Sequence, residues 1–523
     1  MRVRAALVVA AASLLLVTGV VPARGSGPMH PSAIVAPQAA SRSDEGGSDF
    51  NGDGYADLAV SAELWPTTDE DDAFPGAVYV LYGSARGLTQ AGRQRLLAAD
   101  FTPGDTDETF GEVLTTGDFD GDGFADLAIG GSDLPYGPGG GTGRVWVVYG
   151  SPSGLSPARR QLWSQSTPGI LGQPESDDGF GSVLVAADFG RGSQDDLAIG
   201  VGGEDGFRGA VAVIYGSSAG LTAAGNQLWT QASKGIPGKR QPHDNFGLSL
   251  AAGSFSGGPQ ADLAVGVPGD RVAGMEEAGS VNVLRGSPTG LTSAGARLWN
   301  QRTAGIKGSP QPMDGFGWSL ATGHLAGRSN ADLVIGAPGE NAYRGAVAVI
   351  YGSARGLTAK GDQLWTRRTK GLGDRSRLDH DLGATMIVGS FGRDGRTRRY
   401  DDLVVRASDD KGVDLVEVIY GTARGLSPRH SRAWDLDSRG IKGKMSFNGT
   451  FFGSSLAAGR FGADAAGSGY DDLVIGDDFN DDGLFVVIHG SRTGLTARDD
   501  RLWTAPQFRV PGLRYLGRAL AAG

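Results

Sequence analysis

Seven copies of one sequence unit occur in this chain, spaced 66 to 70 residues apart, and three separate markers recur in step within them. The first marker is Tyr-Gly-Ser-x-x-Gly-Leu or a close variant, beginning at Tyr82, Tyr149, Tyr215, Arg285, Tyr351, Tyr420 and His489. The second is an Asp-Leu pair at Asp57, Asp126, Asp196, Asp262, Asp332, Asp402 and Asp472. The third is Phe-Gly-x-x-Leu or a close variant, at Phe110, Phe180, Phe246, Phe316, Leu382, Phe452 and Leu516. Self-similarity at a fixed period indicates a repeat architecture.

Each unit contains four short segments with the composition of β-strands. In the unit that begins at Phe316, these segments are residues 317–322, 332–336, 345–351 and 363–366. The second and third are apolar and rich in β-branched residues, the fourth is more polar, and turn residues separate them. Four strands without a helical period are typical of a propeller blade. The sequence therefore predicts an all-β, seven-bladed β-propeller over residues 49–523.

The two ends of the repeat region complement one another. The chain reaches its first calcium-type loop at Asp49 without a preceding Phe-Gly-x-x-Leu strand, and it stops at Gly523 just after one, which begins at Leu516. We expect this last strand to join the first blade as its inner strand. Such closure removes the open sheet edges that would otherwise invite aggregation.

The first 23 residues resemble a secretory signal peptide. A basic start is followed by an uncharged apolar run from Ala5 to Val21 and by small residues up to Ala23. An uncleaved membrane anchor is the alternative, since 17 apolar residues are at the short limit for spanning a bilayer. We expect cleavage and secretion, a flexible linker over residues 24–48, and no membrane span in the mature chain.

The net charge and the absence of cysteine exclude several kinds of ligand and cross-link. The chain has no cysteine, which excludes disulfides and thiolate metal sites. Without Arg2 and Arg4 its 46 Lys and Arg stand against 58 Asp and Glu, a net charge of −12. Such an acidic chain is a poor candidate for binding nucleic acid and suits divalent cations better.

Two loops have the ligand pattern of a calcium site. The first loop offers oxygen atoms from Asp49, Asn51, Asp53, Asp57 and the carbonyl of Tyr55. The second offers Asp118, Asp120, Asp122, Asp126 and the carbonyl of Phe124. Calcium takes six to eight hard oxygen ligands, and a glycine at the sixth position allows the sharp turn. We predict two Ca²⁺ ions and leave open plain Asp-Gly turns, as well as a weaker third site at Asp188 and Asp196.

The corresponding loops of the other blades lack most of these acids but keep the final aspartate. Because this residue is present in all seven copies, we expect it to cap the turn independently of metal.

The repeat units resemble those of FG-GAP proteins. Phe316-Gly317 followed by Gly336-Ala337-Pro338 matches both halves of the family's name. The resemblance is to the N-terminal propeller of integrin α-subunits and to bacterial secreted FG-GAP/VCBS proteins, and it covers residues 49–523. It implies a calcium-binding propeller that contacts an extracellular protein or glycan. The leg and anchoring segments of integrins have no counterpart here, so integrin-type pairing is not implied, and we expect a monomer.

No catalytic constellation is visible in the sequence. Gly216-Ser217-Ser218-Ala219-Gly220 has the form of a nucleophile elbow, but it is one copy of the repeated turn and lacks the strand-to-helix setting. Six tryptophans share one repeat position and are expected to pack between blades, namely Trp163, Trp229, Trp299, Trp365, Trp434 and Trp503.

The leading hypothesis is therefore a non-catalytic binding or adhesion module, and the rival is a secreted hydrolase or lyase of lipids or polysaccharides. The loops after the second and fourth strands vary most between blades, so we expect the ligand to bind there. Trp65 and Tyr136 lie in two of these loops and are the predicted aromatic contacts.

Overall fold

The structure is a computed structural model. It describes residues 48–65, 74–105, 107, 109–131, 141–327, 329–372, 380–393, 399–409, 413–444, 451–462, 469–478 and 483–522. All of these residues belong to one compact unit. The predicted signal peptide, nearly all of the predicted linker, and Tyr136 lie outside the described residues.

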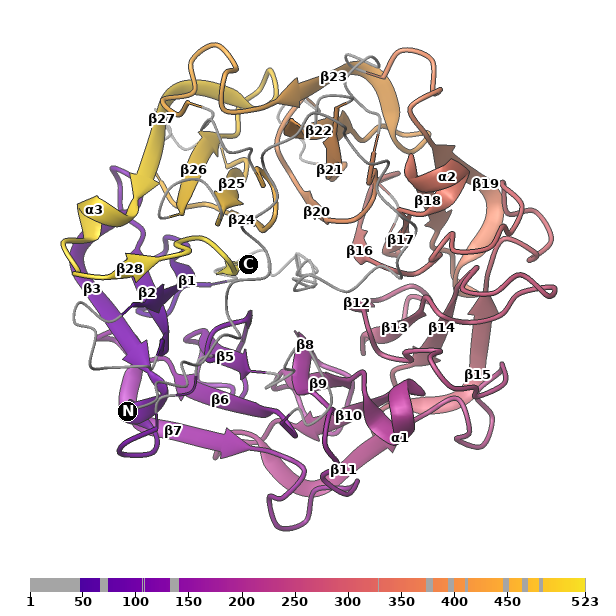
Figure 1. The fold of residues 1–523 in the computed structure, drawn as a ribbon, viewed down its shortest axis with the longest axis horizontal. Coiled ribbons are helices and arrows are strands. Elements are labelled where there is room, and N and C mark those ends of the chain that lie inside the picture. The colour runs from indigo at the N-terminus through magenta and orange to yellow at the C-terminus, as the bar shows by residue number, and fades with distance from the viewer. Residues whose placement is uncertain are drawn as a thin grey trace, which may run out of the picture. The chain divides into compact units, whose positions relative to one another are not determined.

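Seven antiparallel sheets are arranged in a ring, and each sheet is one blade (Figure 1). The four strands of each blade are counted from the centre of the ring, where the first strand lies, to the rim, where the fourth lies. Blade one contains β29 (Leu520–Ala521), β1 (Leu58–Leu64), β2 (Gly76–Tyr82) and β3 (Thr89–Leu97), with the short β28 (Leu513–Arg514) beside β1. Blade two contains β4 (Val113–Gly117), β5 (Asp126–Gly131), β6 (Arg144–Tyr149) and β7 (Ser156–Trp163). Blade three contains β8 (Phe180–Ala187), β9 (Asp196–Val201), β10 (Ala210–Tyr215) and β11 (Thr222–Trp229).

The remaining four blades repeat this order. Blade four contains β12 (Leu250–Gly253), β13 (Asp262–Val267), β14 (Ser280–Arg285) and β15 (Thr292–Trp299). Blade five contains β16 (Leu320–Gly323), β17 (Asp332–Ala337), β18 (Ala346–Tyr351) and β19 (Thr358–Trp365). Blade six contains β20 (Met386–Gly389), β21 (Asp402–Ser408), β22 (Asp414–Tyr420) and β23 (Ser427–Trp434). Blade seven contains β24 (Leu456–Gly459), β25 (Asp472–Asp477), β26 (Leu484–His489) and β27 (Thr496–Thr504).

Helical structure is confined to single turns between strands. These turns are α1 (Glu204–Phe207), α2 (Glu340–Tyr343), α3 (Ala505–Phe508) and the 3-10 turn Ala98–Asp100. No helix within the described residues is long and apolar enough to cross a membrane.

The hydrophobic core lies between blades. The second and third strands are buried along nearly their whole length, as for β17 and β18, because both of their faces pack against neighbouring sheets. Seven apolar clusters each combine side chains from two adjacent blades. The six repeated tryptophans fall one in each of six clusters, which confirms that they pack between blades.

The C-terminal strand closes the ring as the sequence predicts. In the ladder between β29 and β1, Leu520 is opposite Val60 and Ala521 is opposite Ala59. The inner strands of all seven blades contact one another in an unbroken circle, in which β29 lies between β24 and β4. The pairing of β28 with β1, through Leu513 opposite Leu64, is an addition that the repeat pattern does not indicate.

Strand boundaries differ from the prediction at the first and fourth positions. In blade five the inner strand begins at Leu320 rather than residue 317, because Phe316 and Gly317 belong to a turn in which Gly317 has a φ of +94°. The outer strand begins at Thr358 rather than residue 363, so the polar half of this segment also pairs with β18.

Candidate metal loops and binding face

The first predicted calcium loop leads directly into β1, and its backbone wraps around one carboxylate. Asp49 Oδ1 accepts the amide protons of Gly52 (2.6 Å) and Asp53 (3.0 Å), and its Oδ2 accepts that of Gly54 (2.7 Å). Asn51 Oδ1 accepts from the Asp53 amide, and Asp53 Oδ1 accepts from the Tyr55 amide. Gly52 and Gly54 have φ of +74° and +86°, conformations that glycine adopts without strain.

The second predicted loop repeats this geometry between β4 and β5. Asp118 accepts the amide protons of Gly121 (2.7 Å), Asp122 (3.1 Å) and Gly123 (3.0 Å). Carboxylate oxygens of Asp118, Asp120 and Asp126 lie within 4.8 Å of one another, close enough to share one ion. In the described part of the chain no other group of three acids has oxygens this close together. The acids of the first loop are therefore farther apart than this limit.

An arginine distinguishes the second loop from the first. The Arg159 guanidinium, on the outer strand β7, pairs with Asp120 and lies 3.2 Å from Asp122 Oδ2. It also stacks over the ring of Tyr149, 5.2 Å from its centroid. Gly92 occupies the equivalent repeat position in blade one. The second loop therefore has a cation of the protein beside its carboxylates, whereas the first has a glycine there.

The final aspartate of each loop ties two turns of its blade together. One of its oxygens accepts the amide proton of the glycine that follows the third strand, namely Gly83, Gly150, Gly216, Gly286, Gly352, Gly421 and Gly490. In the first two blades the other oxygen accepts from Phe50 and Phe119. The expected turn-capping role of this residue is confirmed, and it is the same in calcium-type and degenerate loops.

Burial changes the acidity of these final aspartates. Desolvation raises the pKa of Asp57 and of Asp126 to about 8, although backbone hydrogen bonds lower it and neighbouring acids raise it further. A divalent cation would favour the charged form of such a group.

The donor chemistry of both loops fits a hard cation. Each supplies only carboxylate and amide oxygens in a turn that glycines keep tight, and neither offers a nitrogen or sulfur ligand. At the weaker third candidate, Asp188 accepts the amide proton of Gly190 (2.8 Å), and Asp196 accepts those of Phe189 and Gly216. Position three of that loop has no acid, so fewer oxygens converge there.

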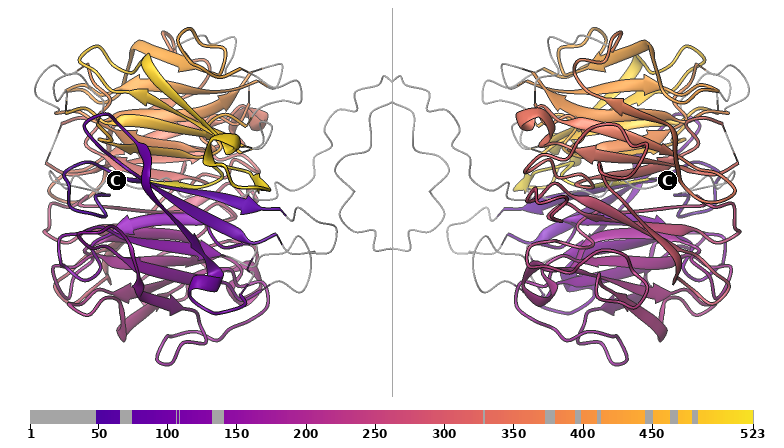
Figure 2. Two further views of the ribbon diagram at one scale, coloured as in Figure 1. Left: turned by 90° about the vertical axis from the view of Figure 1, so that its left-hand side faces the viewer. Right: turned by 90° about the vertical axis from the view of Figure 1, so that its right-hand side faces the viewer.

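The opposite face of the ring is formed by the loops after the second and fourth strands. Figure 2 shows the blades from the side, with the loops gathered at the two ends of the strands. Among the described residues, the large apolar side chains that are exposed are Trp65, Leu162, Leu171, Phe207, Met275 and Phe451. All except Leu162 lie in loops after a second or fourth strand. We call these five residues the apolar tips.

The predicted contact Trp65 is one of the apolar tips. It is 41 % exposed and contacts Phe74 and Tyr515, with ring centroids at 5.1 and 6.2 Å. Phe207 is equally exposed and stacks on His243, with ring centroids 5.8 Å apart. The sequence analysis missed Phe207, although its position just after a second strand is the signal that selected Trp65.

Two of the loops on this face contain turns whose residues have left-handed backbone conformations, with positive φ. In α1, Asp205, Gly206 and Phe207 have φ of 53°, 70° and 59°, and in α2 Asn341, Ala342 and Tyr343 have 57°, 60° and 64°. Left-handed residues other than glycine cost about 1 kcal/mol or more each. The surrounding structure must therefore hold both turns in place, and both present an aromatic residue at their end.

The central channel is lined by the inner strands. As bounded in the structure, β4, β8, β12, β16, β20, β24 and β29 contain only Phe, Met, Ile, Leu, Val, Ala, Gly, Ser and Thr. The wall that these strands form offers no acid or base. The elbow-like string keeps the hydrogen bond of the repeated turn, since Ser217 Oγ, next to Ser218 in the nucleophile position, donates to the Gly220 carbonyl at 2.7 Å.

Comparison with known proteins identifies the repeat. The FG-GAP repeat family matches residues 43–81 and 110–148. Phosphatidylinositol-glycan-specific phospholipase D from Rattus norvegicus is 28 % identical over 236 residues, which are 44 % of this chain and 26 % of that protein. The Homo sapiens protein of the same name is 32 % identical over 180 residues, 33 % of this chain and 20 % of that protein. Integrin alpha-PS2 from Drosophila melanogaster is 28 % identical over 240 residues, 44 % of this chain and 15 % of that protein.

These matches span about a quarter or less of each relative's own length. Among solved structures, the Dos1 propeller is 14 % identical and has a TM-score of 0.36, covering 70 % of this chain and 78 % of that one. A rhamnogalacturonan lyase from Bacillus licheniformis is 12 % identical and has a TM-score of 0.36, covering 89 % and 76 %.

Proposed function

We propose that this chain, an FG-GAP repeat protein with an integrin-α-like propeller, is a secreted, calcium-binding module that captures an extracellular protein or glycan without catalysis. The apolar tips are the observation that carries this proposal. Of the six large apolar side chains exposed in the part of the chain that the structure describes, five share one face, although each blade has loops on both faces. The tips lie in loops of different blades, and loops that a rigid scaffold presents on one face commonly carry the binding residues.

The tips have the chemistry of contact residues. Trp65 and Phe207 each expose an aromatic ring on a loop, and aromatic rings contribute large contact area for little lost side-chain freedom. Arg514 lies over the Trp65 ring at 6.0 Å, and Arg406 lies over the Phe451 ring at 5.8 Å. A surface of rings beside guanidinium groups suits a ligand with both apolar and acidic parts.

Calcium has a separate role in this proposal. The two metal loops lie on the face opposite to the tips, because each leads into the second strand of its blade, β1 or β5. Asp49, Asn51, Asp53 and Asp57 would hold one ion, with the Tyr55 carbonyl. Asp118, Asp120, Asp122 and Asp126 would hold the other, with the Phe124 carbonyl. The ions would stabilise blades one and two rather than contact the ligand.

The test compares exposed apolar residues in two places. The protein is screened on an array of extracellular proteins and glycans, with and without calcium. Trp65→Ala and Phe207→Ala are then measured against the best partner. We expect each to weaken capture about tenfold or more, as for aromatic contact residues at other interfaces. The predicted contact Tyr136 is tested in the same series as Tyr136→Ala.

Leu162→Ala is the matched control. Leu162 is 39 % exposed, close to the 41 % of Trp65, but lies on the outer strand β7. Capture that survives the tip variants and is lost in the control would refute the face assignment, and so would capture abolished only by Asp53→Ala.

A hydrolase or lyase of lipids or polysaccharides is the second candidate, and the phospholipase D relatives favour it over other enzyme classes. Turnover of glycosylated phosphatidylinositol or of a polysaccharide by the purified chain would establish it.

A further inference from the structure

Three neighbouring blade junctions share a buried set of one glutamine and two acids. We call them the Gln-acid junctions: Gln165, Asp178 and Glu204 between blades two and three; Gln231, Asp244 and Asp270 between blades three and four; Gln301, Asp314 and Glu340 between blades four and five. The spacing is identical in all three, with 13 residues from glutamine to aspartate and 26 from there to the second acid. All nine side chains are at most 8 % exposed.

The junction of blades four and five shows how the set is arranged. Gln301, which follows the last strand of blade four, donates from Nε2 to Glu340 Oε2 of blade five at 2.6 Å. Asp314 Oδ2 accepts the Gln311 amide proton at 2.7 Å. Gln301 Oε1 and Asp314 Oδ1 are buried and have no hydrogen-bond partner.

The junction of blades two and three has the same bonds. Gln165 Nε2 donates to Glu204 Oε2 at 2.8 Å, and Asp178 Oδ2 accepts the Glu175 amide proton at 2.7 Å. The same two oxygens, Gln165 Oε1 and Asp178 Oδ1, are again without a partner.

At the junction of blades three and four, the side-chain amide of the glutamine has no hydrogen-bond partner at all. Neither Nε2 nor Oε1 of Gln231 has a partner, although Gln231 is only 4 % exposed. Asp270, the second acid of this junction, accepts from Ser280 Oγ at 2.6 Å.

Each junction therefore has two buried acids and a glutamine whose buried Oε1 has no hydrogen-bond partner. At the junction of blades four and five, Glu340 Oε1 also accepts from Gln311 Nε2 at 3.5 Å and from Asn341 Nδ2 at 3.4 Å, but neither donor serves the glutamine oxygen. A proton shared by the carboxyl groups would neutralise them, but it would leave the glutamine Oε1 without a partner, and such an atom costs about 1–3 kcal/mol. A cation satisfies all three oxygens at once. Two carboxylates match the charge of a divalent ion, and oxygen-only donors select calcium or magnesium.

We propose that each Gln-acid junction binds one divalent hard cation through the glutamine Oε1 and its two acids. The ion bridges consecutive blades, because the glutamine and first acid follow the fourth strand of one blade and the second acid belongs to the next. Glu204 and Glu340 are also the first residues of α1 and α2. The ion thereby anchors the left-handed turns that present Phe207 and Tyr343.

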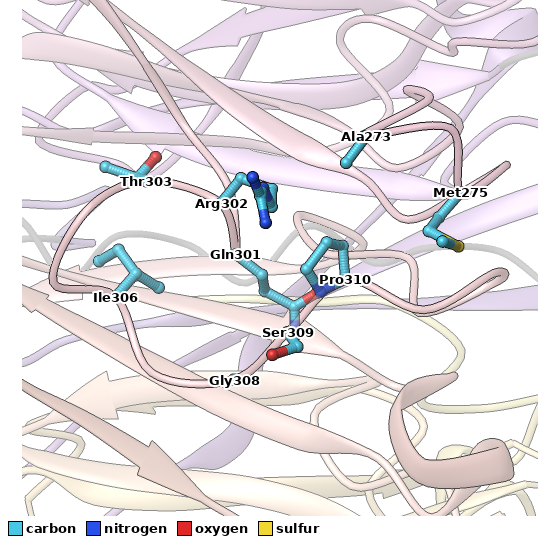
Figure 3. Close-up of a pocket in the computed structure, with 9 residues that line it drawn as sticks. All are labelled: Ala273, Met275, Gln301, Arg302, Thr303, Ile306, Gly308, Ser309 and Pro310. Atoms are coloured by element: carbon cyan, nitrogen blue, oxygen red, sulfur yellow. The ribbon is translucent and has the colours of Figure 1, made fainter.

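The junction of blades four and five is open to solvent through a cavity. This cavity has a volume of about 630 Å³ and lies between the loop of Ala273 and Met275 and the loop of residues 301–310. Gln301 is part of its wall, as Figure 3 shows, together with Ser309 and Pro310. The two acids do not line this cavity, so an ion that enters it meets the glutamine of the junction first.

The test uses the full chain with the two metal loops disabled by Asp53→Ala and Asp122→Ala. Calcium and magnesium are titrated into this background by calorimetry. We expect Glu204→Gln, Asp270→Asn and Glu340→Gln each to lower the number of bound divalent ions by one. Arg367→Ala is the control, since Arg367 has the repeat position of Gln301 but carries no oxygen ligand, and His380 stands there in place of the first acid; the variant should leave the number unchanged.

A background protein that binds neither ion at millimolar concentration would overturn the proposal, as would an unchanged number of ions in all three variants. Where an acid variant fails to fold, Gln301→Ala replaces it, with the same expected loss of one ion. A shared proton instead of a metal ion would appear as no binding heat, together with unaltered stability in Glu340→Gln.

Discussion

On one face of the propeller, every blade makes the same bond, from the glycine after its third strand to the last aspartate of its first loop. On the other face, the loops differ in length and sequence and contain left-handed turns and exposed apolar residues. The first face can be called regular and the second variable. The difference shows that the repeat is maintained where the loops hold each blade together, and is relaxed where the loops meet solvent.

Both faces depend on a closed ring. The variant with the largest expected effect tests this closure. Deletion of Leu516–Gly523 removes β29 and leaves β1 and the neighbouring inner strands uncovered. We expect no cooperative thermal unfolding transition in the truncated protein, measured by circular dichroism. A truncated protein with the melting temperature of the full chain would show that the ring does not need this strand.

The regular face is expected to tolerate substitution least. Asp332→Ala removes the acceptor for the amides of Ala326 (3.1 Å) and Gly352 (2.9 Å) in a loop that is not predicted to bind metal. Each unsatisfied amide costs about 1–3 kcal/mol, so we expect a loss of about 2–5 kcal/mol in urea unfolding. Phe207→Ala on the variable face should cost about 1 kcal/mol or less. Equal losses would remove the distinction between the faces.

The regular face should also make stability depend on pH. Asp471 accepts the Ser390 amide proton at 2.7 Å, and desolvation raises its pKa from 3.8 to about 6, although that bond and Arg460 lower it. Because the folded state holds this proton more tightly than the unfolded state, the contribution is present below pH 4 and is lost as pH rises through 6. Asp471→Asn should flatten the pH dependence of unfolding between pH 4 and 6. An unchanged slope would contradict the assignment.

The metal loops of the regular face should contribute less than the capping aspartates. At millimolar calcium and a Kd of about 10⁻⁴ to 10⁻³ M, each ion adds about 1 kcal/mol. Asp53→Ala and Asp122→Ala should each remove one bound ion and that increment. Asp205→Ala changes the same charge on the variable face and should remove neither. Calorimetry supplies the ion count and thermal unfolding supplies the increment, and an unaltered count in both loop variants would exclude these sites.

The smallest predicted effect separates the two loops from each other. Arg159 competes with a cation for Asp120 and Asp122. Asp120 is buried, but the Arg159 side chain is 47 % exposed, and water screens such a guanidinium, so the pairing is worth about 0.2–1 kcal/mol. Arg159→Ala should therefore tighten calcium binding at the second loop by up to about fivefold and leave the first loop unchanged. Weaker binding in this variant would mean that Arg159 organises the loop instead of competing for it.

The period, the seven blades, the closing strand and the packing of Trp163 and its five counterparts between blades could all be predicted from the sequence. Each rests on local pattern repeated seven times, so neighbouring copies confirm one another. The strand boundaries could not be predicted in the same way, even in the unit that matches the pattern fully. The inner strand of blade five starts at Leu320 because a turn through Gly317 precedes it, and apolar character alone does not distinguish the two.

The sequence by itself determined the fold and the capping role of Asp57 and its six counterparts, and it also supplied the predicted donor residues of both metal loops. These depend on spacing within one repeat, which a single chain displays directly. Only the tertiary structure decided that Arg159 lies beside Asp120, that the apolar tips share a face, and that Gln301 meets Glu340. The residues in each of these three cases come from different strands or different blades. Their relative positions depend on how successive sheets pack and twist around the ring.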